Sequence, residues 1–229
     1  MSVDLDAYDQ LAAPKGTRRL IPSRFPPIPA FEDVCAPHDL DAVMFLEGWT
    51  NDRLVAPRLA RLAREEQVYG RENASIVMAA FLHGSPSGLR FSDASLGAWY
   101  AATSLTTAVL EVANGLRKEI ALSALNSKAE TYREYRADLG GVYLDIIGKH
   151  PEFHDPDDAS YPAPQAFGRA VRALGPRAKI AGIRYESVRH RGHENWVCFR
   201  PKQVLNVVQA DHLRIEVPVS GAVIVRRMA

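Results

Sequence analysis

Residues 180–225 read IAGIRYESVRHRGHENWVCFRPKQVLNVVQADHLRIEVPVSGAVIV, and this stretch decides the fold class. Its branched and aromatic residues gather in short runs, which is typical of strands. The runs cover residues 180–185, 196–199, 204–208, 213–217 and 222–225. Together with the helices expected upstream, they predict an α+β domain with a mainly antiparallel sheet and flanking helices.

Two further elements are predicted immediately upstream of this stretch. A helix is expected to open near Pro164, since proline suits a first turn, and to close before Gly175. Residues 131–147 predict two strands joined at Gly140 and Gly141, because this residue pair suits the positive dihedral angles of a tight hairpin turn.

The segment LGAWYAATSLTTAVLEVANGL, residues 96–116, predicts a strand followed by a helix. Ser104 is the expected helix cap. The apolar residues of the helix recur on one face. Glu111 therefore falls on the opposite or a flanking face, together with Thr107 and Asn114.

The N-terminal third is less regular. Residues 19–29 contain four prolines and predict an extended strap, because proline and the residue before it disfavour helix. Apolar spacing predicts a helix from Asp39 to about Leu62. The apolar run at residues 74–82 fits a buried strand or a helix equally well.

The charge balance limits the function classes. Lys and Arg number 28 against 27 Asp and Glu, for a formal net charge of +1. Such a balance argues against a generalised nucleic-acid or anionic-membrane binder, so any anion site must be local. No secretory start and no long apolar run is visible, so we expect a cytoplasmic protein.

Cysteine and metal chemistry are not indicated. Cys35 and Cys198 are far apart in sequence and are predicted to be buried, apolar side chains. The histidines and aspartates of residues 150–158 match no standard zinc or calcium spacing. We therefore expect no metal site.

Several side chains are candidates for a site, each with an ordinary alternative. Arg24 lies in the stiff strap and Arg90 follows a glycine-containing loop, and either could grip a phosphate or lie on the surface. Tyr100 could stack on a cationic ring or pack in the core. Glu111 could hold a ribose hydroxyl and stabilise an oxocarbenium ion, or be a solvated carboxylate.

The polar run after residue 186 adds three more candidates. Ser187 serves either a site or a turn. The stretch lacks a GxSxG elbow, so a serine hydrolase gains no support. His190 and His193 could lie near a substrate, but no third metal ligand is evident, and their roles stay open.

Whole segments of the chain resemble the RES family, which is named for an arginine, a glutamate and a serine. These segments are RLIPSRFPPI, LRFSDASLGAWYAATSLTTAVLEVA, PAPQAFGRAVRALG and IAGIRYESVRHRGHENWVCFRP. The chain departs from the common pattern at Gly88–Phe91, where many members have two glycines and a tryptophan, and at His193, where glycine is common. The resemblance predicts one RES domain over residues 1–229, with core motifs at 18–201, an N-terminal extension and a β-rich C-terminal tail.

The resemblance implies a fold like that of ADP-ribosyltransferases and a toxin that degrades NAD. NAD is then the substrate, with no cofactor, and inorganic phosphate is the co-substrate if the reaction is phosphorolysis rather than hydrolysis. Arg24 and Arg90 would clamp the pyrophosphate, Tyr100 would pack beside nicotinamide, Glu111 would orient the ribose, and Ser187 would hydrogen-bond within the pocket. The implied partner is a helix-turn-helix antitoxin, with no direct nucleic-acid or membrane binding expected, and the oligomeric state, homo-oligomer included, stays open.

Three alternatives remain on sequence alone. An ADP-ribosyltransferase that modifies a protein would use the same residues and differ only in the acceptor. A non-catalytic nucleotide-binding module is disfavoured because the arginine and glutamate are present. An α+β scaffold that only binds an antitoxin would leave NAD levels unchanged.

Overall fold

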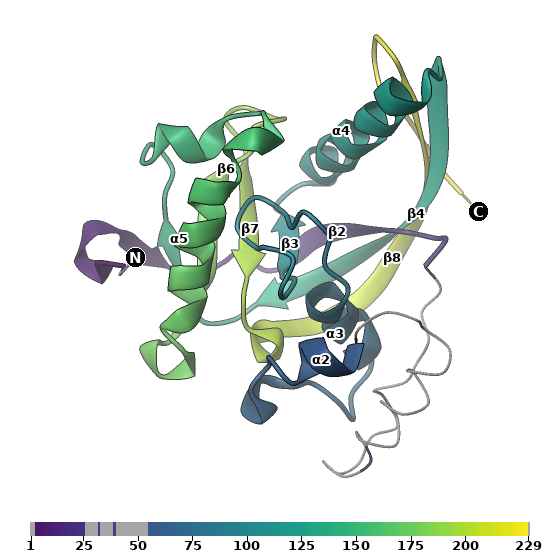
Figure 1. The fold of residues 1–229 in the computed structure, drawn as a ribbon. Helices are drawn as coiled ribbons and strands as arrows, with labels where there is room; N and C mark the ends of the chain where they lie inside the picture. Colours follow the sequence, from purple (N-terminus) through teal and green to yellow (C-terminus); the bar gives the residue numbers. More distant parts are fainter. Residues whose placement is uncertain (1–2, 26–31, 33–38, 40–54, 229) are drawn as a thin grey trace.

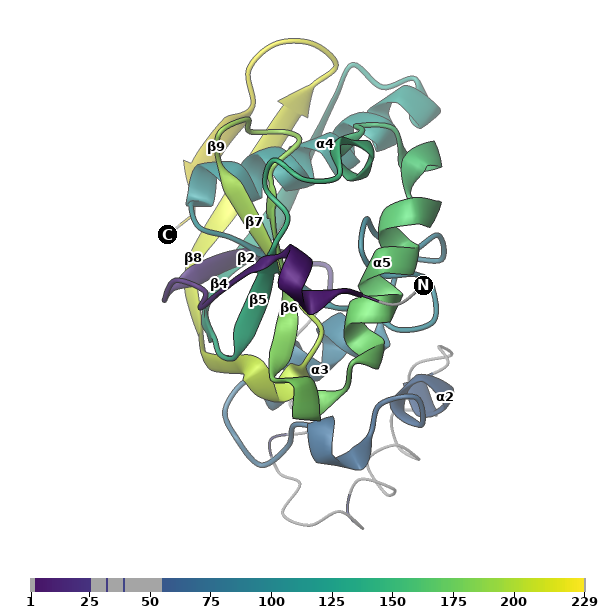
Figure 2. The same ribbon diagram turned by 90° about the vertical axis from the view of Figure 1, so that its left-hand side faces the viewer.

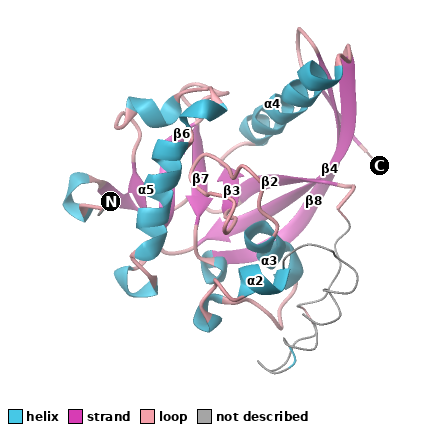
Figure 3. Ribbon diagram, viewed as in Figure 1, coloured by secondary structure: helices cyan, strands magenta, loops and turns pink. Residues whose placement is uncertain are grey.

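The computed structural model describes residues 3–25, 32, 39 and 55–228 (Figures 1 and 3). Its strands are β1 (Asp9–Leu11), β2 (Thr17–Pro22), β3 (Trp99–Ala102), β4 (Ser127–Leu139), β5 (Val142–Asp145), β6 (Ile180–Glu186), β7 (Glu194–Cys198), β8 (Val204–Pro218) and β9 (Ile224–Arg227). Its α-helices are α2 (Val55–Leu59), α3 (Ala74–Leu82), α4 (Leu105–Ser123) and α5 (Pro162–Ala173). Single 3-10 turns are η1 (Leu5–Ala7), η2 (Arg64–Glu66), η3 (Pro151–His154), η4 (Asp158–Ser160), η5 (Pro176–Ala178) and η6 (Pro201–Gln203).

The described strands form one sheet in the order β1-β5-β6-β7-β3-β2-β4-β8-β9. Every neighbouring pair is antiparallel except β5 and β6. The prediction of an α+β fold with a mainly antiparallel sheet is confirmed. The runs at 204–208 and 213–217 are one long strand, β8, which pairs with β4 along almost its whole length.

The hairpin predicted at residues 131–147 is wrong. Strands β4 and β5 do follow one another, but they do not pair: β4 lies between β2 and β8, and β5 lies between β1 and β6. The first joining glycine is bonded elsewhere, since the Gly140 N–H donates to the carbonyl of Gln203. Long-range pairing therefore determines this connection, and the local turn signal does not.

At β3, helices pack on both faces of the sheet, and Figure 2 gives a second view of these elements. Successive residues of a strand point to opposite faces. On β3, Trp99 and Ala101 pack in the core cluster that contains α3. Tyr100 packs with the α5 cluster and Ala102 with the α4 cluster. Helices α4 and α5 therefore share one face above β3, and α3 covers the other.

The helix predictions near the site are confirmed. Ser104 caps α4, its side chain accepting a hydrogen bond from the Thr107 N–H. Helix α5 begins two residues before the expected Pro164, and residues 74–82 form a helix, α3.

The other predictions concern the N-terminal region and the cysteines. The strap is extended through β2, and residues 26–29 lie outside the described part of the chain. Most of the helix predicted from Asp39 also lies outside it, as does Cys35. Cys198 is buried, as expected. No helix in the described part of the chain is long and apolar enough to cross a membrane.

Candidate functional site

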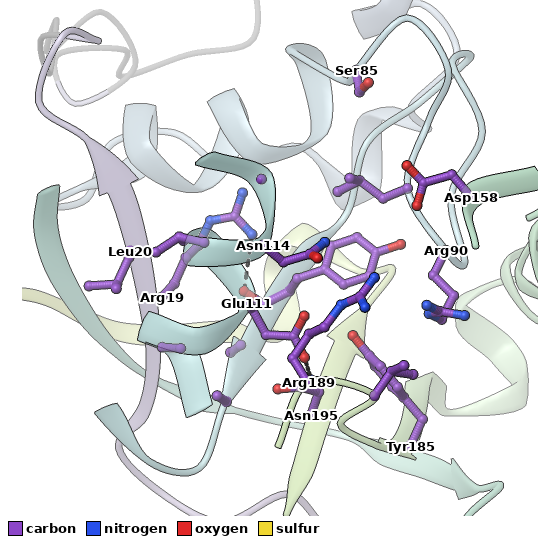
Figure 4. Close-up of a pocket in the computed structure, with 18 of the residues that line it drawn as sticks. Arg19, Leu20, Ser85, Arg90, Glu111, Asn114, Asp158, Tyr185, Arg189 and Asn195 are labelled. Atoms are coloured by element: carbon purple, nitrogen blue, oxygen red, sulfur yellow. Dashed lines mark hydrogen bonds between the residues drawn. The ribbon is translucent and has the colours of Figure 1, made fainter. Parts of the chain in front are cut away.

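A cavity of about 480 Å³ opens on the α4 and α5 face of the sheet (Figure 4). Its volume falls in the range typical of small-molecule sites. It is lined by β2, β3, α4, the loop before β3, the η4 turn and the segment between β6 and β7. The charged side chains that line it are Arg18, Arg19, Arg90, Lys118, Arg189, Glu111 and Asp158. Cations outnumber carboxylates, so the cavity suits an anionic ligand despite the near-neutral chain.

The cavity lies where two neighbouring strands separate. Strands β2 and β3 pair at only one position, Arg18 with Ala102. Arg19 follows at this opening, and its Nη1 donates to the carbonyl of Tyr100, 3.0 Å away. Its Nε is buried without a hydrogen-bond partner. Burial lowers the pKa of Arg19 to about 10, so the guanidinium is still charged at neutral pH.

Glu111 extends from α4 to the floor of the cavity and is held there by two donors. The Ser187 hydroxyl donates to Glu111 Oε1 at 2.7 Å, and Asn195 Nδ2 donates to the same oxygen, also at 2.7 Å. Both donors are buried, at 0% and 3% exposure. Because both bonds go to Oε1, the second oxygen, Oε2, is left for a ligand in the cavity.

Ser187 is itself fixed by the turn that follows β6. Its N–H donates to the carbonyl of His193, and its Oγ accepts from the His190 N–H at 3.0 Å. The His190 ring lies 2.9 Å from Thr107 Oγ1 on α4 and stacks on His193 with ring centroids 3.5 Å apart. The two histidines thus tie the Ser187 turn to α4, and neither lines the cavity.

Arg90 is positioned by a tight loop against α5. Gly88 has a positive φ of +74°, and a side chain there would collide with the carbonyl of Ser92. Gly168 of α5 lies so close to Phe91 that a Cβ would come within 1.9 Å of its carbonyl oxygen. The Arg90 guanidinium is buried and lies above the ring of Tyr161, 5.1 Å from its centroid.

The donors of Arg90 are only partly used by the protein. Its Nη1 donates to the carbonyls of Phe153 and Asp155, at 2.6 and 2.8 Å. Two other cations bind the same loop: Arg189 Nη2 donates to the carbonyl of Pro156, and Lys118 pairs with Asp158. The loop from Phe153 to Asp158 is thereby held by the side chains that line the cavity.

Tyr100 lines the cavity from β3, next to the opening between the strands. Its hydroxyl accepts from the Phe91 N–H and lies 3.0 Å from Ser92 Oγ. Burial raises the pKa of Tyr100, so the phenol stays neutral. The ring faces the cavity while the hydroxyl supports the Arg90 loop.

The structure brings Arg90, Tyr100 and Glu111 to one cavity, with Ser187 bonded directly behind Glu111. It does not bring Arg24 there. Arg24 lies past the end of β2, pairs with Glu130 of β4, and is half exposed. The strand runs past the cavity before it reaches residue 24, so Arg18 and Arg19 occupy the place expected for it.

Sequence reasoning missed several residues of the site. Arg19 stands five positions before Arg24 in the quoted segment RLIPSRFPPI, and Arg18 stands one position before that segment. The strand register alone decides which of these arginines reaches the cavity. Asn195 carries no motif, and only the pairing of β7 with β3, which places it opposite Ala102, reveals it. Tyr185 resembled an ordinary strand residue.

Comparisons with known proteins cover most of the chain. The model of the family described as the RES domain matches residues 58–218, most of the chain. The uncharacterized protein y4oC of Sinorhizobium fredii (strain NBRC 101917 / NGR234) is 29% identical over 133 residues, which make up 58% of this chain and 52% of the relative. The chain thus spans about half the length of this curated relative.

Proposed function

Because the chain belongs to the RES domain family, we propose that it is an NAD-consuming enzyme that cleaves the bond between nicotinamide and ribose. Depletion of cellular NAD would make it a toxin. We also propose a fold related to ADP-ribosyltransferases, supported by a cavity at the opening between β2 and β3.

The observation that carries the proposal is the pinned carboxylate of Glu111. Two buried donors fix one oxygen, so the other is oriented toward the ligand before any ligand arrives. A preorganised charge stabilises a developing opposite charge without the cost of reorganisation. Such a carboxylate fits a reaction in which a sugar becomes positively charged.

Cleavage of NAD is a reaction of this kind. The bond between C1′ and the pyridinium nitrogen breaks, and its electron pair goes to the nitrogen, so nicotinamide leaves as a neutral molecule. The ribose acquires oxocarbenium character, which Glu111 stabilises more than it stabilises the ground state. An oxygen of phosphate or water then bonds to C1′, and water gives up a proton.

The remaining side chains would bind the substrate and orient its ribose. Arg90 and Arg19 would bind the pyrophosphate through the donors that the protein leaves unused. Tyr100 would pack beside the nicotinamide ring. Remote binding energy of this kind orients the ribose over the carboxylate.

We further propose that the protein acts in the cytoplasm and is inhibited by a helix-turn-helix antitoxin. The excess of cations at the cavity supports this proposal, because acidic side chains of such a partner would be attracted to them.

The test is incubation of the purified protein with NAD, with and without inorganic phosphate, followed by mass identification of the products. ADP-ribose phosphate, formed only with phosphate, shows phosphorolysis, and free ADP-ribose shows hydrolysis. A mass-shifted protein shows ADP-ribosyl transfer to a side chain. A Glu111→Gln preparation controls for contaminating enzymes, and unchanged NAD with the wild-type protein would refute the proposal.

A further inference from the structure

Three tyrosines line the cavity, and they differ in what their hydroxyls do. The Tyr100 hydroxyl is bonded to the loop at Phe91 and Ser92. The Tyr161 hydroxyl is hydrogen-bonded to Asp158. The Tyr185 hydroxyl has no hydrogen-bond partner among the described residues, although its side chain belongs to the hydrophobic core around α5.

The ring of Tyr185 is held firmly, so its free hydroxyl has a fixed direction. Tyr185 lies on β6, is 7% exposed, and packs edge-on against Phe91 with ring centroids 4.9 Å apart. Figure 4 shows the hydroxyl pointing into the cavity. Its buried ring and polar tip form an arrangement in which a tyrosine normally finds a partner for its O–H group. The cavity is where that partner must come from.

The electrostatic surroundings keep this hydroxyl a donor. Burial and then the nearby charge of Glu111 raise the pKa of Tyr185 well above its ordinary value. The charge of Arg90 lowers this pKa, but the other effects outweigh it. The phenol therefore stays protonated and stands between the carboxylate assigned to the ribose and the guanidinium assigned to the pyrophosphate.

We propose that Tyr185 is a substrate-binding residue whose hydroxyl donates to the phosphate that adjoins the ribose held by Glu111. This inference rests on the proposed function. Along the substrate, the group that follows this ribose is a phosphate, whose oxygens are strong acceptors and need donors. A neutral O–H can donate to that phosphate beside Glu111, whose Oε1 is bonded to Ser187 and Asn195 and whose Oε2 is left for the ribose.

The test is Tyr185→Phe, which removes a single oxygen, with binding of ADP-ribose, ADP and AMP measured by calorimetry. ADP carries the phosphate in question and AMP lacks it. We expect affinity for ADP-ribose and for ADP to fall roughly tenfold, the effect of a hydrogen bond to a charged group, and affinity for AMP to stay unchanged. The matched control is Tyr135→Phe, which removes a hydroxyl bonded to Gln209 on the opposite face of the sheet.

Each other outcome overturns the assignment. Loss with ADP-ribose alone would place the hydroxyl on the ribose, and equal loss with AMP would place it on the adenosine side. Unchanged binding by a folded variant would show that the hydroxyl binds nothing. If the wild-type protein binds ADP-ribose and consumes NAD in these cases, only this inference fails. If it does neither, the proposed function fails with it.

Discussion

The two ends of the cavity are built differently. At the carboxylate end, Glu111 is bonded to two buried side chains that come from the sheet and from the turn after β6. At the cationic end, Arg90 and Arg189 bind backbone carbonyls of the loop from Phe153 to Asp158. The first end is preorganised by the core, whereas the cations of the second end hold a loop and keep further donors that a phosphate can use. We therefore expect changes at the first end to affect turnover and changes at the second to affect binding.

The largest effect is expected from Glu111→Gln. It keeps the shape of the side chain but removes the charge that stabilises the oxocarbenium ion, so turnover of NAD should fall by roughly a hundred- to a thousandfold. Affinity for ADP-ribose should change little. Single-turnover kinetics and calorimetry measure the two effects separately. Near-wild-type turnover by a folded variant would refute the assigned role.

A smaller loss is expected when the support of Glu111 is removed. Ser187→Ala and Asn195→Ala each delete one donor to Oε1, and turnover should fall roughly ten- to a hundredfold because the carboxylate is no longer fixed. Ser187→Ala also leaves the partly buried His190 N–H without its acceptor, which should cost about 1 kcal/mol of unfolding free energy.

Comparing the loss of turnover with the loss of ADP-ribose affinity shows whether Ser187 and Asn195 position Glu111 or only stabilise the fold. If these two variants lost affinity for ADP-ribose as strongly as turnover, they would be acting through the shape of the cavity rather than through Glu111. Ser187→Cys, which retains a weak donor, should recover part of the turnover lost in Ser187→Ala.

At the cationic end, Arg90→Ala and Arg19→Ala should weaken binding of ADP-ribose by roughly tenfold or more, with a smaller change in turnover of bound NAD. Arg24→Ala is the matched control, because Arg24 pairs with Glu130 away from the cavity. Its affinity should stay within about twofold of the wild type, since exposed ion pairs contribute little. If Arg24→Ala lost affinity for ADP-ribose, Arg24 would bind the pyrophosphate as the sequence predicts.

The contrast between Arg24 and Arg19 shows which features of the site can be predicted from the sequence and which cannot. The segment and the residue type were predicted, but strand register decided which arginine reaches the cavity. Helical periodicity is local, and it separated Glu111 from the apolar face of its helix, although it grouped Glu111 with Thr107, which is fully buried. Asn195 and the separation of β4 from β5 depend on pairing between distant strands, which leaves no signal in either segment alone.

The smallest effect tests the exposed rim of the cationic end. Asp158 pairs with Lys118, and both side chains are nearly half exposed. Burial acts to raise the pKa of Asp158, but hydrogen bonds from Lys118 and Tyr161 outweigh it and hold the pKa below its usual value. The carboxylate is thus ionised at neutral pH and repels a phosphate. Asp158→Asn should bind ADP-ribose about two- to threefold more tightly at low salt, with the gain lost at high salt, where exposed charges are screened. Calorimetry at the two salt concentrations measures this change in affinity.

Weaker binding by Asp158→Asn would mean instead that Asp158 accepts a hydrogen bond from the substrate. The exposed rim would then be part of the binding site and not a source of repulsion.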